Sequence, residues 1–358
     1  MTSGTEPSRW CARYGAVANI EASLEGPLSS SAELRRRPLG SASGLFVTDI
    51  GLGLWAVPGG EWGPGEDADS LAAIEAAFDA GVNFFDTADV YGAGHSEELL
   101  GRAMAGRREQ FIVATKIGWT GFDRANDRSQ YDTIDQLVAG VALSLERLRT
   151  DYVDVIQCHI SYPEPNTEVF IQGFRKLKEA GTVRAWGVST GDINHLRRFN
   201  AEGDCDTLQI DYSILNRFPE REVLPYCREH GIGVIVRGPL AMGLLSGKYR
   251  AEDEFPEGDF RRAWVENPEQ HSQFLADLVD VDKLKALAPA GTSLADLALR
   301  FVLSHPVVTT VIPGARNRRQ AEANTATGLQ PLLSEDEMAA IDGIVAPGGG
   351  RKIWPEIT

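Results

Sequence analysis

Four polar residues in this sequence follow apolar runs at positions where they could support proton-transfer chemistry. Asp86 and Tyr91 follow one run, Lys116 ends a second, and His159 ends a third. A phenol such as that of Tyr91 can donate a proton to an oxygen on which negative charge develops, as when hydride reaches a carbonyl carbon. A neighbouring ammonium group, here Lys116 with Asp86 as its counter-ion, favours the phenolate and so makes the phenol a better acid. His159 could then orient the substrate oxygen or share the proton.

Taken singly, each of these residues also has a structural interpretation. An aspartate at a strand end commonly caps a turn, a lysine there is commonly solvated, and a histidine is commonly satisfied within the core. A shared site is favoured because the residues end three different strands of one repeating pattern. In a parallel barrel the carboxyl ends of the strands form one rim, where active sites are built.

Short apolar strands alternate with amphipathic helices along most of the chain. We expect eight strands in α/β alternation, which favours a closed parallel (β/α)8 TIM barrel over an open sheet. A short hairpin at the bottom of the barrel is expected over residues 38–47. The predicted strands are 50–55, 83–87, 111–116, 153–159, 183–189, 207–211, 233–237 and 307–312. The helices predicted between them are 69–80, 133–148, 169–180, 193–199 and 221–230.

One long segment interrupts the alternation. Residues 245–274 are rich in acidic and aromatic side chains and are predicted to form a loop at the C-terminal face. Part of it, residues 255–262, is predicted to close over the site. At the domain level we expect an irregular N-terminal extension over 1–36, the barrel over 37–346 and a C-terminal tail over 347–358.

Composition narrows the class of protein. The chain has 358 residues, of which 43% are hydrophobic and 24% charged, and its formal net charge is −16. An acidic chain does not suit nucleic acid, whose phosphates require clustered lysine and arginine. No apolar run approaches the roughly 20 residues that span a bilayer, and no signal peptide is evident. With no metal-type spacing among its cysteines, we expect a cytoplasmic protein without a metal, and homo-oligomerisation stays open.

The arrangement resembles the aldo-keto reductase family from about residue 38 to residue 344. The matching stretches are 84–92, 115–116, 158–159, 186–189, 209–213, 238–249 and 312–316. The resemblance implies a barrel that binds NADPH across its C-terminal face without a Rossmann domain. It also implies Tyr91 as the general acid, tuned by Lys116 and Asp86. His159 would position the substrate carbonyl.

By the same resemblance, residues after later strands hold the cofactor. Ser189 and Gln209 would hydrogen-bond the nicotinamide carboxamide, and Tyr212 would offer a flat face for stacking. The family generally has Asn after this Ser, whereas Thr190 occupies that cofactor position here and cannot reproduce the donor and acceptor of an amide. As alternatives to cofactor binding, Ser189 and Gln209 could cap the ends of their strands, and Tyr212 could pack in the core. The loop residues expected to shelter the pyrophosphate are Gly238, Pro239, Leu240, Gly243 and Leu245.

The segment after the last strand is expected to bind the adenosine end of the cofactor. Gly314 and Ala315 precede a predicted helix, and a helix N-terminus attracts phosphate. Arg316 can hold a 2′-phosphate with several donors, so NADP is favoured over NAD. Gln320 and Asn324 match the family's adenosine-contacting positions. As an alternative to cofactor binding, the polar residues of this segment could form an ordinary solvent-exposed helix start.

The substrate pocket is predicted from residues that follow strands. Trp55, Trp119, Ile160 and Met242 would line an apolar mouth, with rim packing as the alternative for the two tryptophans. The expected partner is a small-molecule carbonyl compound. The long loop and the N-terminal extension favour a bulky one, such as a keto-sugar or a natural-product intermediate.

Two other functions stay open. The same barrel and nucleotide could serve a redox-sensing regulatory subunit, although a pure sensor need not keep an activated acid. Lys116 could instead form a Schiff base, as in an aldolase. That chemistry needs a neutral amine, whereas Asp86 would keep the lysine charged.

Overall fold

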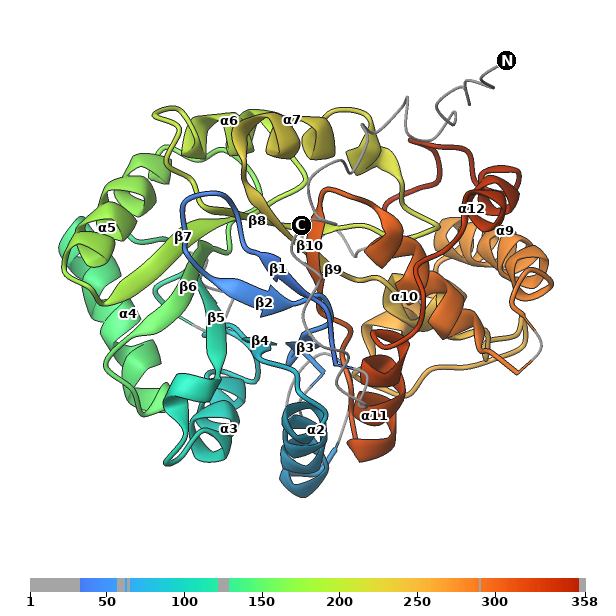
Figure 1. The fold of residues 1–358 in the computed structure, drawn as a ribbon, viewed down its shortest axis with the longest axis horizontal. Coiled ribbons are helices and arrows are strands. Elements are labelled where there is room, and N and C mark those ends of the chain that lie inside the picture. The colour runs from blue at the N-terminus through green and yellow to red at the C-terminus, as the bar shows by residue number, and fades with distance from the viewer. Residues whose placement is uncertain (1–32, 57–61, 63–64, 122–128, 290, 354–358) are drawn as a thin grey trace, which may run out of the picture.

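A parallel barrel forms the centre of the chain in a computed structural model, which describes residues 33–56, 62, 65–121, 129–289 and 291–353. Eight strands pair in the order β10-β9-β8-β7-β6-β5-β4-β3, with helices around them (Figure 1). The two edge strands also meet, because Ile50 pairs with Val311 and Gly53 with Gly314 in parallel bridges. The (β/α)8 barrel predicted from the sequence is therefore confirmed.

The strands begin and end close to their predicted positions. Those predicted at 183–189, 207–211 and 233–237 have these bounds in the structure. The barrel strands are β3 (Leu52–Gly53), β4 (Phe84–Asp86), β5 (Ile112–Ile117), β6 (Val153–Cys158), β7 (Val183–Ser189), β8 (Thr207–Asp211), β9 (Gly233–Arg237) and β10 (Val308–Val311). The predicted helices are α2 (Asp67–Asp79), α4 (Ile134–Leu148), α5 (Thr167–Glu179), α6 (Ile193–Phe199) and α7 (Val223–His230).

Several further helices were not predicted in full. They are α3 (His95–Ala103), α8 (Ala263–Glu266), α9 (Pro268–Lys285), α10 (Leu294–Ser304), α11 (Arg318–Thr327) and α12 (Glu335–Asp342). The prediction of a loop over 245–274 is therefore wrong for its second half. Asn267 accepts hydrogen bonds from the first backbone amides of α9, and Pro268 occupies the first helical position, where its missing N–H costs nothing.

The short hairpin lies at the N-terminal end of the barrel, as predicted. Strands β1 (Arg36–Pro38) and β2 (Phe46–Thr48) pair antiparallel. Leu39, Leu45 and Val47 beside them are buried in one cluster with residues of the barrel interior. The predicted extension over 1–36 lies outside the described residues as far as residue 32. The predicted tail is described as far as Ile353, which is buried.

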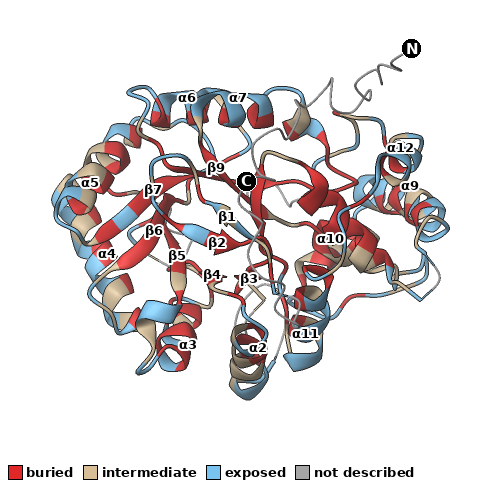
Figure 2. Ribbon diagram, in the orientation of Figure 1, coloured by how far each residue is buried: buried red, intermediate tan, exposed pale blue. Residues whose placement is uncertain are grey.

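Side chains inside the barrel form an apolar layer below a polar one. Phe84, Ala114 and Ile235 belong to a buried cluster inside the barrel, and the strands are buried along most of their length (Figure 2). Alternate residues of a strand point to the same side. Asp86 and Lys116 therefore point inward from the next level. They lie toward the carboxyl ends of the strands, where the site is expected.

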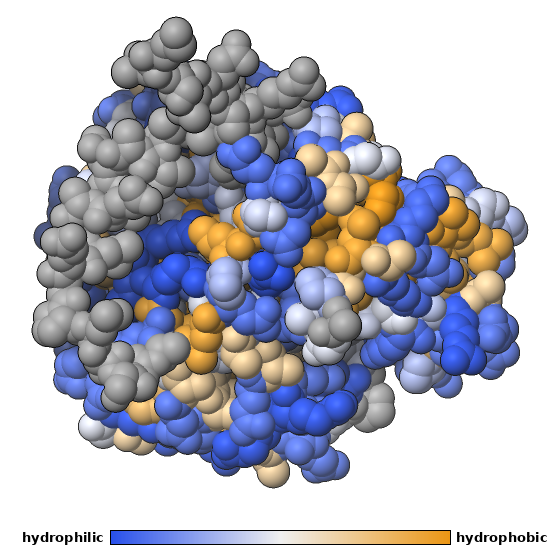
Figure 3. All heavy atoms as spheres, turned by 45° about the vertical axis from the view of Figure 1, so that its right-hand side comes forward, coloured by the Kyte–Doolittle hydropathy of each residue, from blue (hydrophilic) through white to orange (hydrophobic). Residues whose placement is uncertain are grey.

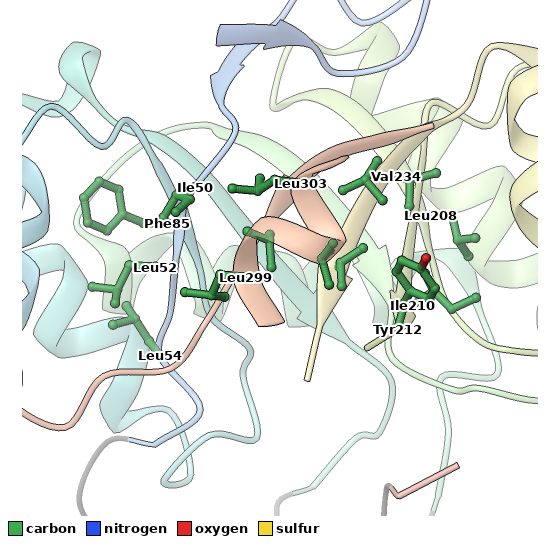
Figure 4. Packing of buried hydrophobic residues seen from close by; sticks show 14 of the residues in the cluster. Ile50, Leu52, Leu54, Phe85, Leu208, Ile210, Tyr212, Val234, Leu299 and Leu303 are labelled. Atoms are coloured by element: carbon green, nitrogen blue, oxygen red, sulfur yellow. The ribbon is translucent and has the colours of Figure 1, made fainter. Parts of the chain in front are cut away.

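A second apolar layer packs the strands against the helices. Leu52, Phe85 and Leu299 belong to this larger cluster, which joins β3 and β4 to α10 (Figure 4). Figure 3 shows that hydrophobic residues also gather in a band across one face of the molecule, between hydrophilic ones. Leu275 and Val279 of α9 are among the exposed large hydrophobic residues. None of the helices within the described ranges is long and apolar enough to cross a membrane.

The close packing of β7 against β8 can be tested by substituting one glycine. A Cβ added to Gly187 on β7 would overlap the backbone and side chain of Thr207 on β8. Gly187→Ala should therefore lower the free energy of unfolding by about 1–3 kcal/mol, measured by chemical denaturation. Gly191→Ala is the control because nothing lies within 4 Å of its added Cβ. Equal stability of the two variants would contradict the packing described here.

Candidate active site

A buried ammonium group joins three of the predicted site residues. Nζ of Lys116 donates to Oδ1 of Asp86 at 2.7 Å, to the backbone oxygen of Thr87 at 2.8 Å and to Oη of Tyr91 at 3.2 Å. Lys116 is 0% exposed, Asp86 2% and Tyr91 9%. All three donors of the ammonium are thus used, and the lysine is held in one position against the phenol.

The strands and one turn bring these groups together. Strands β4 and β5 pair with Asp86 opposite Ala114, so Lys116 lies two residues farther along its own strand, on the same side of the sheet. After β4 the chain turns back, and the amide of Tyr91 donates to the oxygen of Ala88 at 3.2 Å. From β8, Nε2 of Gln209 donates to Oδ2 of Asp86 at 2.7 Å. Both carboxylate oxygens of Asp86 are therefore fixed.

Electrostatics favour a charged lysine beside a neutral phenol. Burial raises the pKa of Tyr91 above its ordinary value, and the charge of Lys116 offsets part of this rise. Burial also opposes charge on Lys116, but Asp86 and Tyr91 outweigh it and raise the pKa of the lysine. From the sequence we expected only that the lysine would lower the pKa of Tyr91, without the larger opposing effect of burial. At neutral pH the phenol keeps its proton, which is the starting state that a proton donor requires.

His159 lies beside the same phenol. It follows β6, and its amide donates to the oxygen of Ile117 at 2.8 Å. The centroid of its ring lies 5.7 Å from that of Tyr91, at an interplanar angle of 79°, and 5.7 Å from that of Trp119. The structure thus brings the four predicted catalytic residues into one group.

A cavity of about 570 Å³ opens next to this group. Asp86, Tyr91 and Gln209 form part of its wall. The other predicted residues that line it are Trp55, Gly238, Pro239, Leu240, Met242, Gly243, Gly314, Arg316, Gln320 and Asn324. The segment predicted to close over the site also reaches the cavity, through Arg261.

The remaining predicted residues do not line the cavity. These are Lys116 and His159 of the catalytic group, together with Trp119, Ile160, Ser189, Thr190, Tyr212, Leu245 and Ala315. The hydroxyl of Thr190 donates to the backbone oxygen of Ser161 at 2.6 Å and accepts from the amide of Asp192 at 3.0 Å. Its side chain is therefore engaged in the local turn. Leu245 is 0% exposed and Ile160 is 1% exposed, so both belong to the core.

Tyr212 requires a specific correction. Its residue is 0% exposed, its hydroxyl donates to Oε1 of Glu220 at 2.7 Å, and its ring lies 5.7 Å from that of Phe301. The expected exposed face for stacking is absent. The reason is strand geometry, because Asp211 at the end of β8 points inward and the next residue points to the opposite side, toward α10.

Basic residues dominate the charged part of the cavity wall. Five of them line it, against Asp86 as the only acidic lining residue within the described ranges. Of these, only Arg316 was predicted from the sequence to bind the cofactor. The five are Arg237, Lys248, Arg261, Arg316 and Arg319. In a chain with a formal net charge of −16, such a local excess of positive charge suits a ligand with several negative charges.

The segment before α11 and the start of that helix form another part of the cavity wall. Arg316 donates its backbone amide to Oε1 of Gln320 at 2.8 Å, and Nδ2 of Asn324 donates to the oxygen of Gly314 at 3.3 Å. Asn317 caps the helix by accepting from the amide of Gln320 at 3.0 Å. These contacts order a loop whose basic side chains face the cavity. Within the described ranges, no group of His, Cys, Asp or Glu is arranged to hold a metal ion.

Comparison with known proteins shows to which protein family the chain belongs. The model of the Aldo/keto reductase family matches residues 49–346. The aldo-keto reductase YhdN of Bacillus subtilis (strain 168) is 36% identical over 301 residues, which cover 82% of this chain and 89% of that protein. The chain therefore belongs to the aldo/keto reductase family.

Solved structures agree with this assignment. The glycerol dehydrogenase AKR11B4 of Gluconobacter oxydans aligns with a TM-score of 0.75 and 31% identity. This alignment covers 92% of this chain and 100% of that one. An aldo-keto reductase of Klebsiella pneumoniae in complex with NADPH aligns with a TM-score of 0.64 and 26% identity. This alignment covers 88% of this chain and 96% of that one.

The buried pair can be tested through stability. Asp86→Asn removes the counter-charge of a lysine that has no access to water, so it should lower the free energy of unfolding by about 3–5 kcal/mol. Asp135→Asn breaks the pair of Asp135 with Lys176, in which both side chains are more than half exposed. That control should change stability by less than about 1 kcal/mol in the same urea titration. Similar small losses in both variants would show that the buried pair is not an ion pair.

Proposed function

We propose that this protein reduces an aldehyde or a ketone to an alcohol, with NADPH as the hydride donor and Tyr91 as the proton donor. The observation that carries the proposal is the hydrogen bond from buried Lys116 to the hydroxyl of Tyr91 at the wall of the cavity. In such a reaction negative charge develops on the carbonyl oxygen, and a phenol placed there can neutralise it.

Each neighbouring residue has a defined part in this proposal. Lys116 lowers the cost of forming the Tyr91 phenolate, because a positive charge lies 3.2 Å from its oxygen. Asp86 keeps the lysine charged and in place. His159, next to the ring of Tyr91, orients the carbonyl oxygen toward the phenol.

The cavity residues fit the proposed cofactor. A nicotinamide dinucleotide phosphate supplies hydride when it is bound and carries several negative charges, which suits a wall with five basic side chains. The loop after β9 offers Gly238 and Gly243 to a pyrophosphate, since residues without side chains allow close approach. Arg316 and Arg319, which also line the cavity, would hold the 2′-phosphate. The related Klebsiella pneumoniae structure contains NADPH, which supports the choice of NADP over NAD.

The substrate is proposed to be a small carbonyl compound that reaches Tyr91 past aromatic residues. Trp55 and Trp62 line the cavity with their ring centroids 5.1 Å apart, and the ring of Trp55 lies 6.4 Å from that of Tyr91. A keto-sugar or a natural-product intermediate remains our suggestion, to be compared with simpler aldehydes and ketones in one assay panel.

A Schiff-base aldolase is disfavoured by the state of the lysine. Imine formation needs a neutral amine with a free path to the substrate. Lys116 is instead fully buried, uses its three donors and is held charged by Asp86. A redox-sensing subunit would bind the same nucleotide, but it would have no need of the proton donor.

Removal of the phenol tests the proposal directly. Tyr91→Phe should lower kcat for carbonyl reduction by about 10²–10⁴-fold, as is typical of a lost general acid, and leave the affinity for NADPH little changed. Loss of NADPH absorbance measures the rate, and fluorescence titration measures affinity. Tyr226→Phe is the control, because its hydroxyl contacts Asn200 and the residue does not line the cavity. Equal rates for wild type and Tyr91→Phe would remove Tyr91 from the mechanism.

Recognition of the 2′-phosphate can be tested separately. Arg316→Ala should weaken binding of NADP by about 10- to 100-fold and leave NAD binding nearly unchanged. A factor of this size corresponds to the free energy of a hydrogen bond to a charged group. Arg318→Ala is the matched control, since this neighbouring arginine pairs with Glu322 and does not line the cavity. Parallel losses for NADP and NAD would exclude a contact between Arg316 and the 2′-phosphate.

A further inference from the structure

The turn between Tyr91 and helix α3 has a costly backbone conformation. Gly92, Ala93 and Gly94 follow one another with φ angles of 58°, 54° and 95°. A left-handed conformation costs free energy in a residue with a side chain, such as Ala93, and it persists only where the surroundings hold it. The backbone oxygen of Tyr91 accepts from the amide of Ser96 at 3.2 Å. The turn that carries the phenol is therefore held from α3.

Ser96, the second residue of α3, also joins two other segments through its hydroxyl. Its Oγ donates to the backbone oxygen of Leu54 at 3.1 Å. A hydroxyl has a single proton, so Oγ1 of Thr87, which lies 2.7 Å away, donates to Ser96. Ser96 and Thr87 are both 0% exposed, so bulk water does not compete for these hydrogen bonds. One side chain thus connects the residue after β3 to the turn after β4.

Each segment that this hydroxyl contacts carries a residue or contact of the proposed site. The backbone oxygen of Thr87 accepts from Nζ of Lys116 at 2.8 Å. Leu54 precedes Trp55, which lines the cavity with its ring centroid 6.4 Å from that of Tyr91. A movement of α3 would therefore displace the phenol relative to the ammonium and to the cavity wall.

The next residue of α3 fixes the helix against β5. Oε1 of Glu97 accepts from Oγ1 of Thr115 at 2.6 Å, and its Oε2 accepts from Nε of Arg147 at 2.6 Å. Glu97 and Thr115 are 0% exposed, and Thr115 directly precedes Lys116. Helix α3 is thus fixed to the strand that carries the ammonium, and the serine links this fixed helix to the turn.

We propose that Ser96 is a positioning residue for proton transfer, whose hydroxyl and amide set the distance between the phenol of Tyr91 and the ammonium of Lys116. This inference rests on the proposed role of Tyr91 as the proton donor. Ser96 does not line the cavity, so it acts through Tyr91 and not on the substrate. The hydrogen bond from Lys116 to the phenol is 3.2 Å long, at the upper end of the usual range, so a small displacement would break it.

Two substitutions remove the two hydroxyls in turn. Ser96→Ala keeps the backbone amide but should lower kcat for carbonyl reduction by about tenfold, because a displaced phenol transfers its proton less readily, and should leave KM for NADPH within about threefold. Ser96→Thr restores a hydroxyl and should recover most of kcat. Thr87→Val removes the partner hydroxyl at similar volume and should lower kcat as well, which preserves the test should a variant of Ser96 fail to fold.

Ser304→Ala is the matched control. Ser304 is 8% exposed, its Oγ donates to the backbone oxygen of Arg300 at 2.7 Å, and it accepts from the amide of Leu333 at 2.8 Å. This substitution also removes two hydrogen bonds of a buried serine, but Ser304 does not line the cavity. It should lower stability toward urea as Ser96→Ala does, and leave kcat unchanged.

The pH profile supplies a readout that a loss of stability alone would not move. In alcohol oxidation Tyr91 must first lose its proton, so kcat rises as pH rises through the pKa of the phenol. Burial raises this pKa, Lys116 lowers it, Asp86 raises it and Arg237 lowers it. When the phenol moves away from the ammonium in Ser96→Ala, the rise in kcat should move to higher pH by about half a unit or more. In the control it should stay where it is in the wild type.

Two results would overturn the inference while the wild type is active. One is a Ser96→Ala variant with the kcat and the pH profile of the wild type, which would show that the serine only stabilises the fold. The other is a lower kcat with the pH profile unmoved and an equal fall in Ser304→Ala, which would indicate a general loss of packing.

Failure of the proposed function would give a different result. A wild-type protein that reduces no carbonyl compound would overturn that function and, with it, the part of Ser96 in proton transfer. The geometry is then tested without turnover, because the 13Cζ resonance of Tyr91, assigned by its loss in Tyr91→Phe, reports the pKa of the phenol. An equal pKa in the wild type and in Ser96→Ala would show that the serine does not set the distance to Lys116.

Discussion

The structure of the site depends on one charged amine that the barrel removes from water. A buried ammonium is costly unless it is paired and hydrogen-bonded, and breaking such a pair leaves an uncompensated charge. Lys116 meets this requirement with Asp86, the oxygen of Thr87 and the hydroxyl of Tyr91. The position of Tyr91 is therefore fixed by the same contacts that make the lysine tolerable in the interior.

The fold supplies these contacts from distant parts of the chain. Asp86 ends β4, Lys116 belongs to β5, and the amide that holds the second carboxylate oxygen comes from Gln209 on β8. The apolar layer below them excludes water, which strengthens each of these interactions. The same end of the barrel gathers basic side chains around a cavity, although the chain as a whole is strongly acidic. A polyanionic cofactor and a proton donor are thus accommodated at one rim.

Sequence reasoning found the strands and the polar residues at their ends because both leave local patterns. An apolar run such as β7 or β9 is short, continuous and bounded by polar residues, so its limits were predicted correctly. Helix α3 was missed because glycines precede it and no side chain caps it. The first part of helix α9, as far as residue 274, was taken for a loop because acidic residues interrupt its apolar positions.

The errors at the site have a common physical origin. Whether a residue faces the cavity depends on the side of the sheet to which it points, and the choice of Tyr212 did not take this into account. Gln209 and Asp211 point inward from β8, whereas Tyr212 points to the opposite side and packs against α10. Arg237 was overlooked because a single arginine after an apolar strand looks like a solvated strand end. Only its register with Asp211 and its place on the cavity wall show that it lies inside the barrel.

The charge on Lys116 is the central claim, and nuclear magnetic resonance of its side chain tests it most directly. The 13Cε and 15Nζ shifts of this lysine, assigned by their loss in Lys116→Met, report whether the nitrogen is an ammonium or an amine. We predict an ammonium throughout the range from about pH 6 to about pH 9, because the charge of Asp86 raises the pKa of the lysine. A neutral amine anywhere in this range would contradict it.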